Sequence, residues 1–185
     1  MRWQLPHLGL RDYDAADGAA KRALRIVEAA LGPAHPLLIQ PLLLLGWSCN
    51  ARGDHQSSLA FLDRVTEICS AAGEAMPAST AWSVLVALGE GMRVAGEHET
   101  ALHNLQQAIA LARELFGPGS AQVAEVRVVM AWVQRDLGDD AAAQDQLSQA
   151  IEVIGRQFGS EHDFTRRLAG RLSQWRAAGP QAKRP

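Results

Sequence analysis

Apolar and polar positions recur along this 185-residue chain with the period of an α-helix. Apolar side chains three and four positions apart give each predicted helix one apolar stripe. Glycine, proline and polar residues separate the periodic segments, as expected for turns. The pattern predicts helices over residues 14–30, 37–52, 55–71, 79–95, 98–116, 121–137, 140–157 and 161–177.

Two kinds of turn recur along the chain, and both have nearly the same spacing of about 42 residues. One set of glycines, Gly32, Gly73, Gly117 and Gly159, is spaced by 41, 44 and 42 residues, and a second set, Gly53, Gly96 and Gly138, by 43 and 42. Glycine suits the left-handed position that ends a helix. An Asp or Glu follows each glycine of the second set, where the dipole of the next helix favours negative charge. Each period therefore predicts a helix A, a tight turn, a helix B and a longer turn.

The inner faces of the predicted helices also repeat. The clearest helix-B faces alternate small and large side chains, which lets neighbouring helices approach closely. The B faces are Ser58, Leu62 and Val65, then Ala101, Leu105 and Ala108, then Ala143, Leu147 and Ala150. The A faces are Leu42, Leu45, Gly46 and Cys49, then Leu85, Leu88, Gly89 and Met92, then Met130 and Ala131. The first period has only a B face, formed by Ala16, Ala20 and Ala23.

These features resemble tetratricopeptide repeats (TPRs) of the 42-residue type found in kinesin light chains and in many bacterial multi-repeat proteins. The small–large–small B faces, the Leu45-Gly46 and Leu88-Gly89 pairs and the linker from Leu31 to Pro36 carry the resemblance. It covers residues 11–178 and implies an all-α fold, a right-handed superhelical TPR solenoid of antiparallel helix pairs. Arg127 departs from the pattern, because it takes a helix-A slot that is usually apolar.

The predicted organisation has three parts. Residues 1–10 contain Pro6 and Gly9 and are expected to be a degenerate N-terminal segment. Residues 11–178 hold helix B of the first repeat, repeats 2–4 and a C-terminal capping helix at 161–177, which offers Leu168, Leu172 and Trp175 for burial. Residues 179–185 are expected to be a flexible tail.

Composition and charge narrow the function classes. The chain is 48% hydrophobic and 21% charged, and alanine (32 residues) and leucine (23) favour helix over sheet. The net charge of −2 gives no support to nucleic-acid binding. The longest clean apolar run, residues 128–133, is too short to span a membrane, and the N-terminus lacks the apolar core of a secretion signal. We therefore expect a cytoplasmic protein without nucleic-acid or membrane partners.

Fragments that look catalytic or metal-binding fit the helices better. The glycines at 89, 91 and 96 do not complete the pattern of a dinucleotide loop, which needs a further glycine at position 94, and they lie in or at the end of a predicted helix. His98 and His103 are five residues apart rather than four, so they do not share a helix face. Asp12, Asp14, Asp17 and Gly18 have the wrong spacing for a calcium loop. Cys49 and Cys69 are not expected to pair. We expect no catalytic residues, no metal and no cofactor.

The resemblance places candidate binding residues on the helix-A side, which lines the groove of the family. The positions carried over are Gln40, Leu43, Trp47 and Asn50, then Ser83, Val86, Glu90 and Arg93, then Glu125, Val128, Trp132 and Arg135. Members of each quartet are 3, 4 and 3 residues apart and so share one face. Trp47 and Trp132 either anchor a peptide, with Arg93 and Arg135 binding its acidic groups, or pack between neighbouring repeats.

The sequence therefore predicts a non-catalytic scaffold or adaptor that binds a protein or peptide segment in the groove of a TPR array. One alternative is a regulatory or substrate-recruiting segment of a larger bacterial signalling protein, such as a Ser/Thr kinase. An enzyme with a dispersed site is a third hypothesis. A homodimer formed through the face of Ala16, Ala20 and Ala23 is a fourth, because that helix lacks an A-helix partner unless residues 1–10 cover it.

Overall fold

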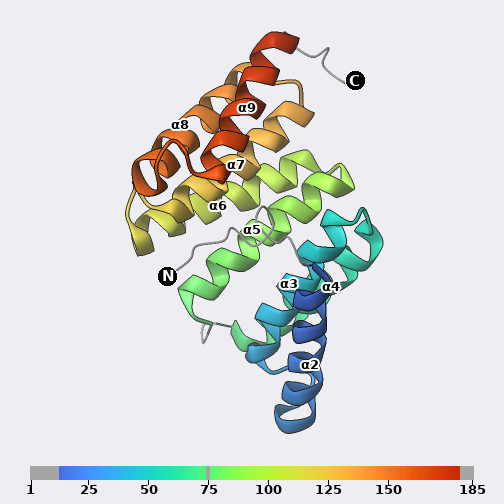
Figure 1. Ribbon diagram of the computed structural model, residues 1–185. Coiled ribbons are helices and arrows are strands. Elements are labelled where there is room, and N and C mark those ends of the chain that lie inside the picture. The colour runs from blue at the N-terminus through green and yellow to red at the C-terminus, as the bar shows by residue number, and fades with distance from the viewer. Residues whose placement is uncertain (1–12, 74–75, 180–185) are drawn as a thin grey trace. The chain divides into compact units, whose positions relative to one another are not determined.

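The computed structural model describes residues 13–73 and 76–179, and every element assigned within them is helical (Figure 1). The elements are α2 (Tyr13–Leu31), η1 (Pro36–Leu38), α3 (Ile39–Ala51), α4 (His55–Ala72), α5 (Ala78–Ala95), α6 (His98–Phe116), α7 (Ala121–Asp136), α8 (Asp140–Phe158) and α9 (Asp163–Ala178). The predicted helices are confirmed, with ends within two residues of the expected ones. The segment 1–10 and residues 180–185 of the expected tail lie outside the described residues.

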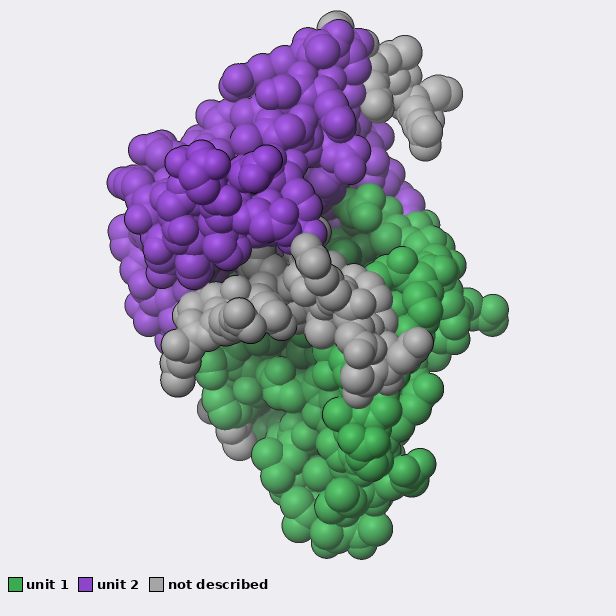
Figure 2. Space-filling view, viewed as in Figure 1, with its two compact units in different colours: residues 1–95 green, residues 96–185 purple. Residues whose placement is uncertain are grey.

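The chain forms two compact units, residues 1–95 (unit 1) and residues 96–185 (unit 2), which Figure 2 shows in green and purple. Unit 1 holds α2 to α5, and its α3 packs against α2, η1, α4 and α5. Unit 2 holds α6 to α9, where α7 packs against α6 and α8, and α8 also packs against α9. Helices that follow each other along the chain are thus also neighbours in space within each unit.

The tight turns end one helix and start the next with local groups. Gly53 (φ 80°) and Gly138 (φ 77°) take the left-handed backbone that side chains with a Cβ avoid. The carboxylates that follow accept hydrogen bonds from free backbone N–H groups, Asp54 from Ser57 (3.1 Å) and Asp139 from Ala142 (3.1 Å). The hydrogen bonds from Ser57 lower the pKa of Asp54 below the usual Asp value. The predicted acidic helix starts are confirmed at both residues.

A histidine begins the next helix after two of the longer turns. His35 Nδ1 accepts a hydrogen bond from the N–H of Leu37 (3.2 Å), and His162 Nδ1 accepts one from the N–H of Phe164 (3.3 Å). Both residues have extended backbone and stand at the N-cap, of η1 and of α9. A neutral imidazole nitrogen thus takes the role that a Ser or Asp oxygen usually has at this position.

Most of the predicted inner faces form the hydrophobic cores of the two units. The exception is α5, where Leu85, Leu88 and Met92 are only half-buried and Val84, Val86 and Ala87 are buried instead. The small–large–small sets of α6 and α8 are fully buried, and so are Leu42 of α3 and Val65 of α4. The capping-helix residues Leu168, Leu172 and Trp175 are buried as expected. Burying apolar surface is worth about 25 cal/mol per Å², so these seams stabilise the helix pairs more than helix propensity does.

Helix α7 carries polar residues into the interior of unit 2. Gln122, Glu125 and Arg135 are buried, and Arg127 is half-buried. Burial lowers the pKa of Arg127, and its Nη1 donates a hydrogen bond to Gln146 Oε1 of α8 (2.6 Å). A charged side chain in an apolar slot is therefore accommodated by a polar partner on the neighbouring helix.

None of the described helices combines the length and the apolar character that crossing a bilayer requires.

Candidate functional site

The four candidate residues of α3 lie at different depths. Gln40 is exposed and Asn50 is half-buried, whereas Leu43 and Trp47 belong to the core cluster of unit 1. Trp47 keeps 8% of its surface exposed, and Leu43 keeps none. Asn50 Oδ1 lies 3.3 Å from His55 Nδ1, which orients its amide at the end of the helix. This face therefore exposes the amide side chains of Gln40 and Asn50 to solvent, whereas Trp47 is almost fully buried.

The candidate residues of α5 lie in the same unit. Helices α3 and α5 pack against each other, so both quartets belong to unit 1. Ser83, Glu90 and Arg93 are half-buried, while Val86 is buried. Ser83 Oγ donates to the backbone carbonyl of Ser79 (3.1 Å). The α5 face thus adds a hydroxyl, a carboxylate and a guanidinium that solvent reaches in part.

The candidate residues of α7 are mostly inside unit 2. Glu125, Val128 and Arg135 are buried, and Trp132 is half-buried. The Arg135 guanidinium donates to the carboxylate of Asp140, the first residue of α8, and lies 5.3 Å from the ring centre of Trp175. An arginine held in this way stabilises the turn between α7 and α8.

Trp132 packs against the capping helix α9. Its ring meets that of Trp175 edge-on, with centroids 4.8 Å apart and an interplanar angle of 88°. The guanidinium of Arg171, also on α9, lies 5.2 Å from the centre of the Trp132 ring. These contacts favour the packing alternative for Trp132, because its ring already contacts the edge-on ring of Trp175 and the guanidinium of Arg171.

A pocket opens between α2 and α3 in unit 1. Its volume is about 390 Å³, and its walls are almost entirely apolar. The lining residues are Ala19, Ala20, Ala23, Gln40, Pro41, Leu44 and Trp47. Sequence reasoning identified Ala20 and Ala23 as an uncovered face, and Gln40 and Trp47 as groove positions, but it did not bring the two sets together.

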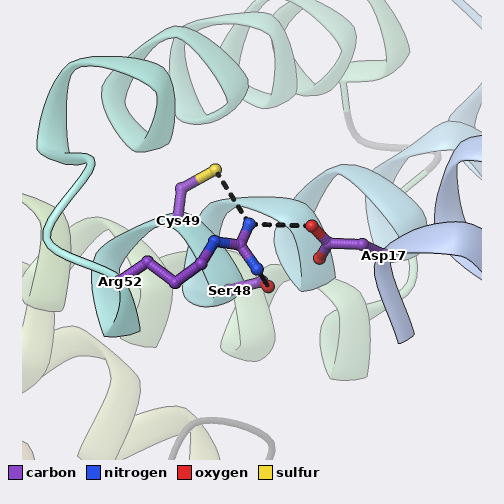
Figure 3. A network of polar contacts seen from close by, with 4 residues as sticks. All are labelled: Asp17, Ser48, Cys49 and Arg52. Atoms are coloured by element: carbon purple, nitrogen blue, oxygen red, sulfur yellow. Dashed lines mark hydrogen bonds and ion pairs between the residues drawn. The ribbon is translucent and has the colours of Figure 1, made fainter. Parts of the chain in front are cut away.

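A polar network fixes α2 against one end of α3 (Figure 3). Arg52, which follows α3, donates to Asp17 Oδ2 of α2 (2.7 Å) and to Ser48 Oγ (2.8 Å). The nitrogen that donates to Asp17, Nη2, also donates to Cys49 Sγ (3.9 Å). The hydrogen bond to Asp17 raises the pKa of Arg52, so the guanidinium stays charged. Asp17 is one of the residues whose spacing weakly resembles a calcium-binding loop. In the structure it lies on helix α2 and forms an ion pair with Arg52.

A second ion pair fixes the other end of α2. Arg64 of α4 donates to the carboxylate of Glu28 and to the backbone carbonyl of Pro33 (3.2 Å). Because Asp17 and Glu28 lie near opposite ends of α2, the helix is attached at both ends. The walls of the α2–α3 pocket are consequently held in place by contacts outside it.

The remaining titratable side chains do not gather into a metal-binding group in the part of the chain that the structure describes. Within residues 13–73 and 76–179, no three His, Cys, Asp or Glu side chains are grouped so that they could hold a metal ion. His103 lies exposed on α6, with Nε2 2.7 Å from Gln107 Nε2. Burial raises the pKa of the Cys69 thiol, which makes its reactive thiolate scarcer.

Comparison with known families explains the repeated helix pairs. The tetratricopeptide repeat family matches residues 7–71 and 79–155, which is more than half of the chain. The chain belongs to the tetratricopeptide repeat family. The expected TPR resemblance and the all-α fold are confirmed. No curated protein sequence is similar enough to count as a relative.

Solved TPR structures have the same fold. The crystal structure of BtubC (BKLC) from P. vanneervenii is similar with a TM-score of 0.66 at 13% identity, covering 91% of this chain and 67% of that one. A crystal structure of nearly identical TPR-like repeats from a kinesin light chain of Podospora anserina gives a TM-score of 0.61 at 16% identity. That match covers 96% of this chain and 91% of the other. At such identities the likeness concerns the fold of this TPR protein alone.

Proposed function

We propose that this TPR protein is a non-catalytic scaffold that holds a peptide or protein segment against the A helices of unit 1. One observation carries the proposal. The A helices α3 and α5 of successive repeats pack together, and each keeps polar side chains partly accessible at the positions that line the groove in this family. The proposed contact residues are Gln40, Trp47, Asn50, Ser83, Glu90 and Arg93.

The chemistry of this surface favours a particular kind of ligand. The amides of Gln40 and Asn50 can each donate and accept, which suits the backbone of an extended peptide. Arg93 supplies a cation for an acidic side chain, and the small part of Trp47 that remains exposed supplies an apolar contact. We therefore expect a segment that combines acidic and apolar residues.

A capture experiment tests the proposal. Proteins bound by the whole chain from a cell extract are compared by mass spectrometry with those bound by the Asn50→Ala/Arg93→Ala variant. Both replaced side chains are partly exposed, so circular dichroism should keep its helical signal while specific partners are lost.

A matched double variant at the exposed residues Glu152 and Arg156 of α8 controls for a general change of surface charge. It should bind the same partners as the unchanged chain. Identical partners for the unchanged chain and the Asn50→Ala/Arg93→Ala variant would show that these positions do not bind the ligand.

A further inference from the structure

One position of the repeat holds leucine in α3 and α5 but arginine in α7. Leu42 and Leu85 are 43 residues apart, and Arg127 follows 42 residues after Leu85. Leu42 is fully buried, and Leu85 and Arg127 are half-buried. Leucine needs only apolar neighbours in such a position, whereas a guanidinium needs partners for its charge and its five N–H groups. The partners of Arg127 therefore indicate whether the charge is used.

The structure satisfies only a part of the Arg127 guanidinium. Its Nη1 donates to Gln146 Oε1 of α8 (2.6 Å), and this amide is neutral. In the part of the chain that the structure describes, Arg127 forms no ion pair with a carboxylate. The hydrogen bond to Gln146 thus holds the guanidinium in place without neutralising it, and other N–H groups remain for a further acceptor.

Arg113 brings a second positive charge close to Arg127. It is exposed in the last turn of α6, and α7 begins after a short turn and packs against α6. Burial and the charge of Arg113 lower the pKa of Arg127. Among the described residues, Arg113 forms no ion pair either. Two guanidiniums that repel each other and share no carboxylate are arranged as expected where an anion binds to both.

Asp145 of α8 limits which anion fits. Its charge raises the pKa of Arg127, against the effects of burial and of Arg113. Its Oδ2 accepts a hydrogen bond from Gln149 Nε2 (2.7 Å), and it forms no ion pair with either arginine. Two cations and one carboxylate leave a single positive charge in excess. This excess favours a carboxylate, which carries one negative charge, over a phosphate dianion.

We propose that Arg113 and Arg127 form a binding site for a carboxylate where α6, α7 and α8 meet. Gln146 is a positioning residue that orients the Arg127 guanidinium. The carboxylate comes from an acidic side chain of a partner segment or from a small free acid, and both have the same chemistry. This goes beyond the proposed scaffold function, because these residues belong to unit 2 and the proposed peptide surface belongs to unit 1.

Two short capped peptides, identical except for one central Glu or Gln, probe the site. Nuclear magnetic resonance of the arginine Nε–H groups in the whole chain follows each guanidinium separately. The Glu peptide should shift the signals of Arg113 and Arg127 saturably, at least about tenfold more tightly than the Gln peptide, and added salt should weaken it. Equal affinities of the two peptides, or no saturable shift with either, would overturn the proposal.

Acetate and inorganic phosphate, at the same ionic strength, identify the kind of anion and its source. Acetate that binds within about threefold of the Glu peptide would show that a small free acid is sufficient. A Glu peptide that binds more tightly than this would favour a partner segment. Both results support the site, whereas phosphate that binds more tightly than acetate and the Glu peptide would contradict its assignment to a carboxylate.

Substitutions locate the site. Arg127→Leu restores the residue found at this position in α3 and α5, so the helical signal and the urea midpoint should not fall, while Glu-peptide binding should weaken at least about tenfold. Arg113→Gln, at an exposed position where folding is not at risk, should weaken it at least about fivefold. Arg156→Leu removes one exposed positive charge elsewhere in unit 2 and should leave the affinity within about twofold. Equal effects of all three variants would contradict the assignment.

Asp145→Asn tests whether the chain fills its own site. It removes a competing charge and should tighten Glu-peptide binding at least about threefold. Binding that appears only in this variant would show that Asp145 is the occupant, and would overturn the proposal. The Asn50→Ala/Arg93→Ala variant separates this site from the proposed function. It should leave the shifts of Arg113 and Arg127 unchanged even where it loses captured partners, and their loss would overturn the inference.

Discussion

Leu105 lies at the centre of the buried face of α6 and is fully excluded from solvent. Truncation to alanine removes buried methyl groups and leaves a cavity, so we expect Leu105→Ala to lower the free energy of unfolding by about 2–5 kcal/mol. Urea denaturation followed by circular dichroism measures this. Leu115→Ala, on the same helix at a position that is 40% exposed, is the matched control and should cost far less. Equal losses would mean that the register of α6 is wrong.

Asp54 gives the stability of unit 1 a defined dependence on pH. Hydrogen bonds from Ser57 lower its pKa in the folded state below the ordinary value of 3.8. A group with a lowered folded pKa stabilises above its unfolded pKa, and this contribution is lost as the pH falls through the folded pKa. We therefore expect the advantage of Asp54 over Asp54→Ala to be constant near neutral pH and to be lost as the pH falls below 3.8 and through the folded pKa.

Asp54→Asn is the control for this titration. Asparagine also caps helices well, but it does not titrate, so its effect on unfolding should not change over the same range. Thermal melts at a series of pH values give the comparison. An advantage of Asp54 over Asp54→Ala that persists unchanged at pH 2 would contradict a role for the ionised cap.

At the scale of elements, Gly91 determines how closely α5 approaches α4. A Cβ at this position would lie 2.4 Å from Leu62 Cδ1, and Leu62 is buried. The better helix propensity of alanine is worth up to about 1 kcal/mol, whereas overpacking costs about 1–3 kcal/mol. We therefore expect Gly91→Ala to destabilise the protein in chemical denaturation.

Gly170 of α9 supplies the opposite case. It is also helical, but an added Cβ would meet nothing within 4 Å. Gly170→Ala should therefore stabilise by about 0.5–1 kcal/mol through propensity alone. If both substitutions stabilise the protein, the packing of α5 on α4 is looser than described.

The buried ion pair of Arg135 and Asp140 joins α7 to α8. The two side chains are only 7% and 9% exposed. Asp140→Ala would leave the Arg135 charge buried without this partner, so we expect a loss of about 3–5 kcal/mol. The Arg135→Met/Asp140→Ala variant removes both charges and should be less destabilised than Asp140→Ala. A double-mutant cycle measures the coupling, and additive effects would show that the pair does not stabilise the turn.

Helix bounds could be predicted from the sequence because local groups determine them. Gly53 and Gly138 end helices through their own backbone freedom, and Asp54 and Asp139 start helices with hydrogen bonds three residues along the chain. The buried faces of α6 and α8 could also be predicted, because the helical period determines which side chains share a face. These features do not depend on where distant segments lie.

The surfaces could be predicted only in part because they depend on contacts between helices. Trp132 matches Trp47 in sequence, but only the position of α9 reveals its contact with Trp175, which is 43 residues later. The pocket likewise needs α2 and α3 side by side. Arg135 and Asp140 did carry a signal, because opposite charges on either side of a tight turn are close in any helix pair.

At the scale of the whole molecule, helix pairs in a repeat protein are stabilised mainly by their nearest neighbours, so helices with fewer neighbours should open more readily. In unit 2, α7 packs mainly against α6 and α8, meets α9 through Trp132 and buries 12 of its 16 residues, whereas α9 packs mainly against α8 and buries 4 of its 16 residues. Hydrogen exchange followed by mass spectrometry should therefore be at least about tenfold faster in α9 than in α7. Leu172→Ala should speed exchange in α9 while leaving α7 unchanged. Equal protection of both helices, or an equal effect of the substitution on both, would mean that α7 and α9 open as one cooperative unit.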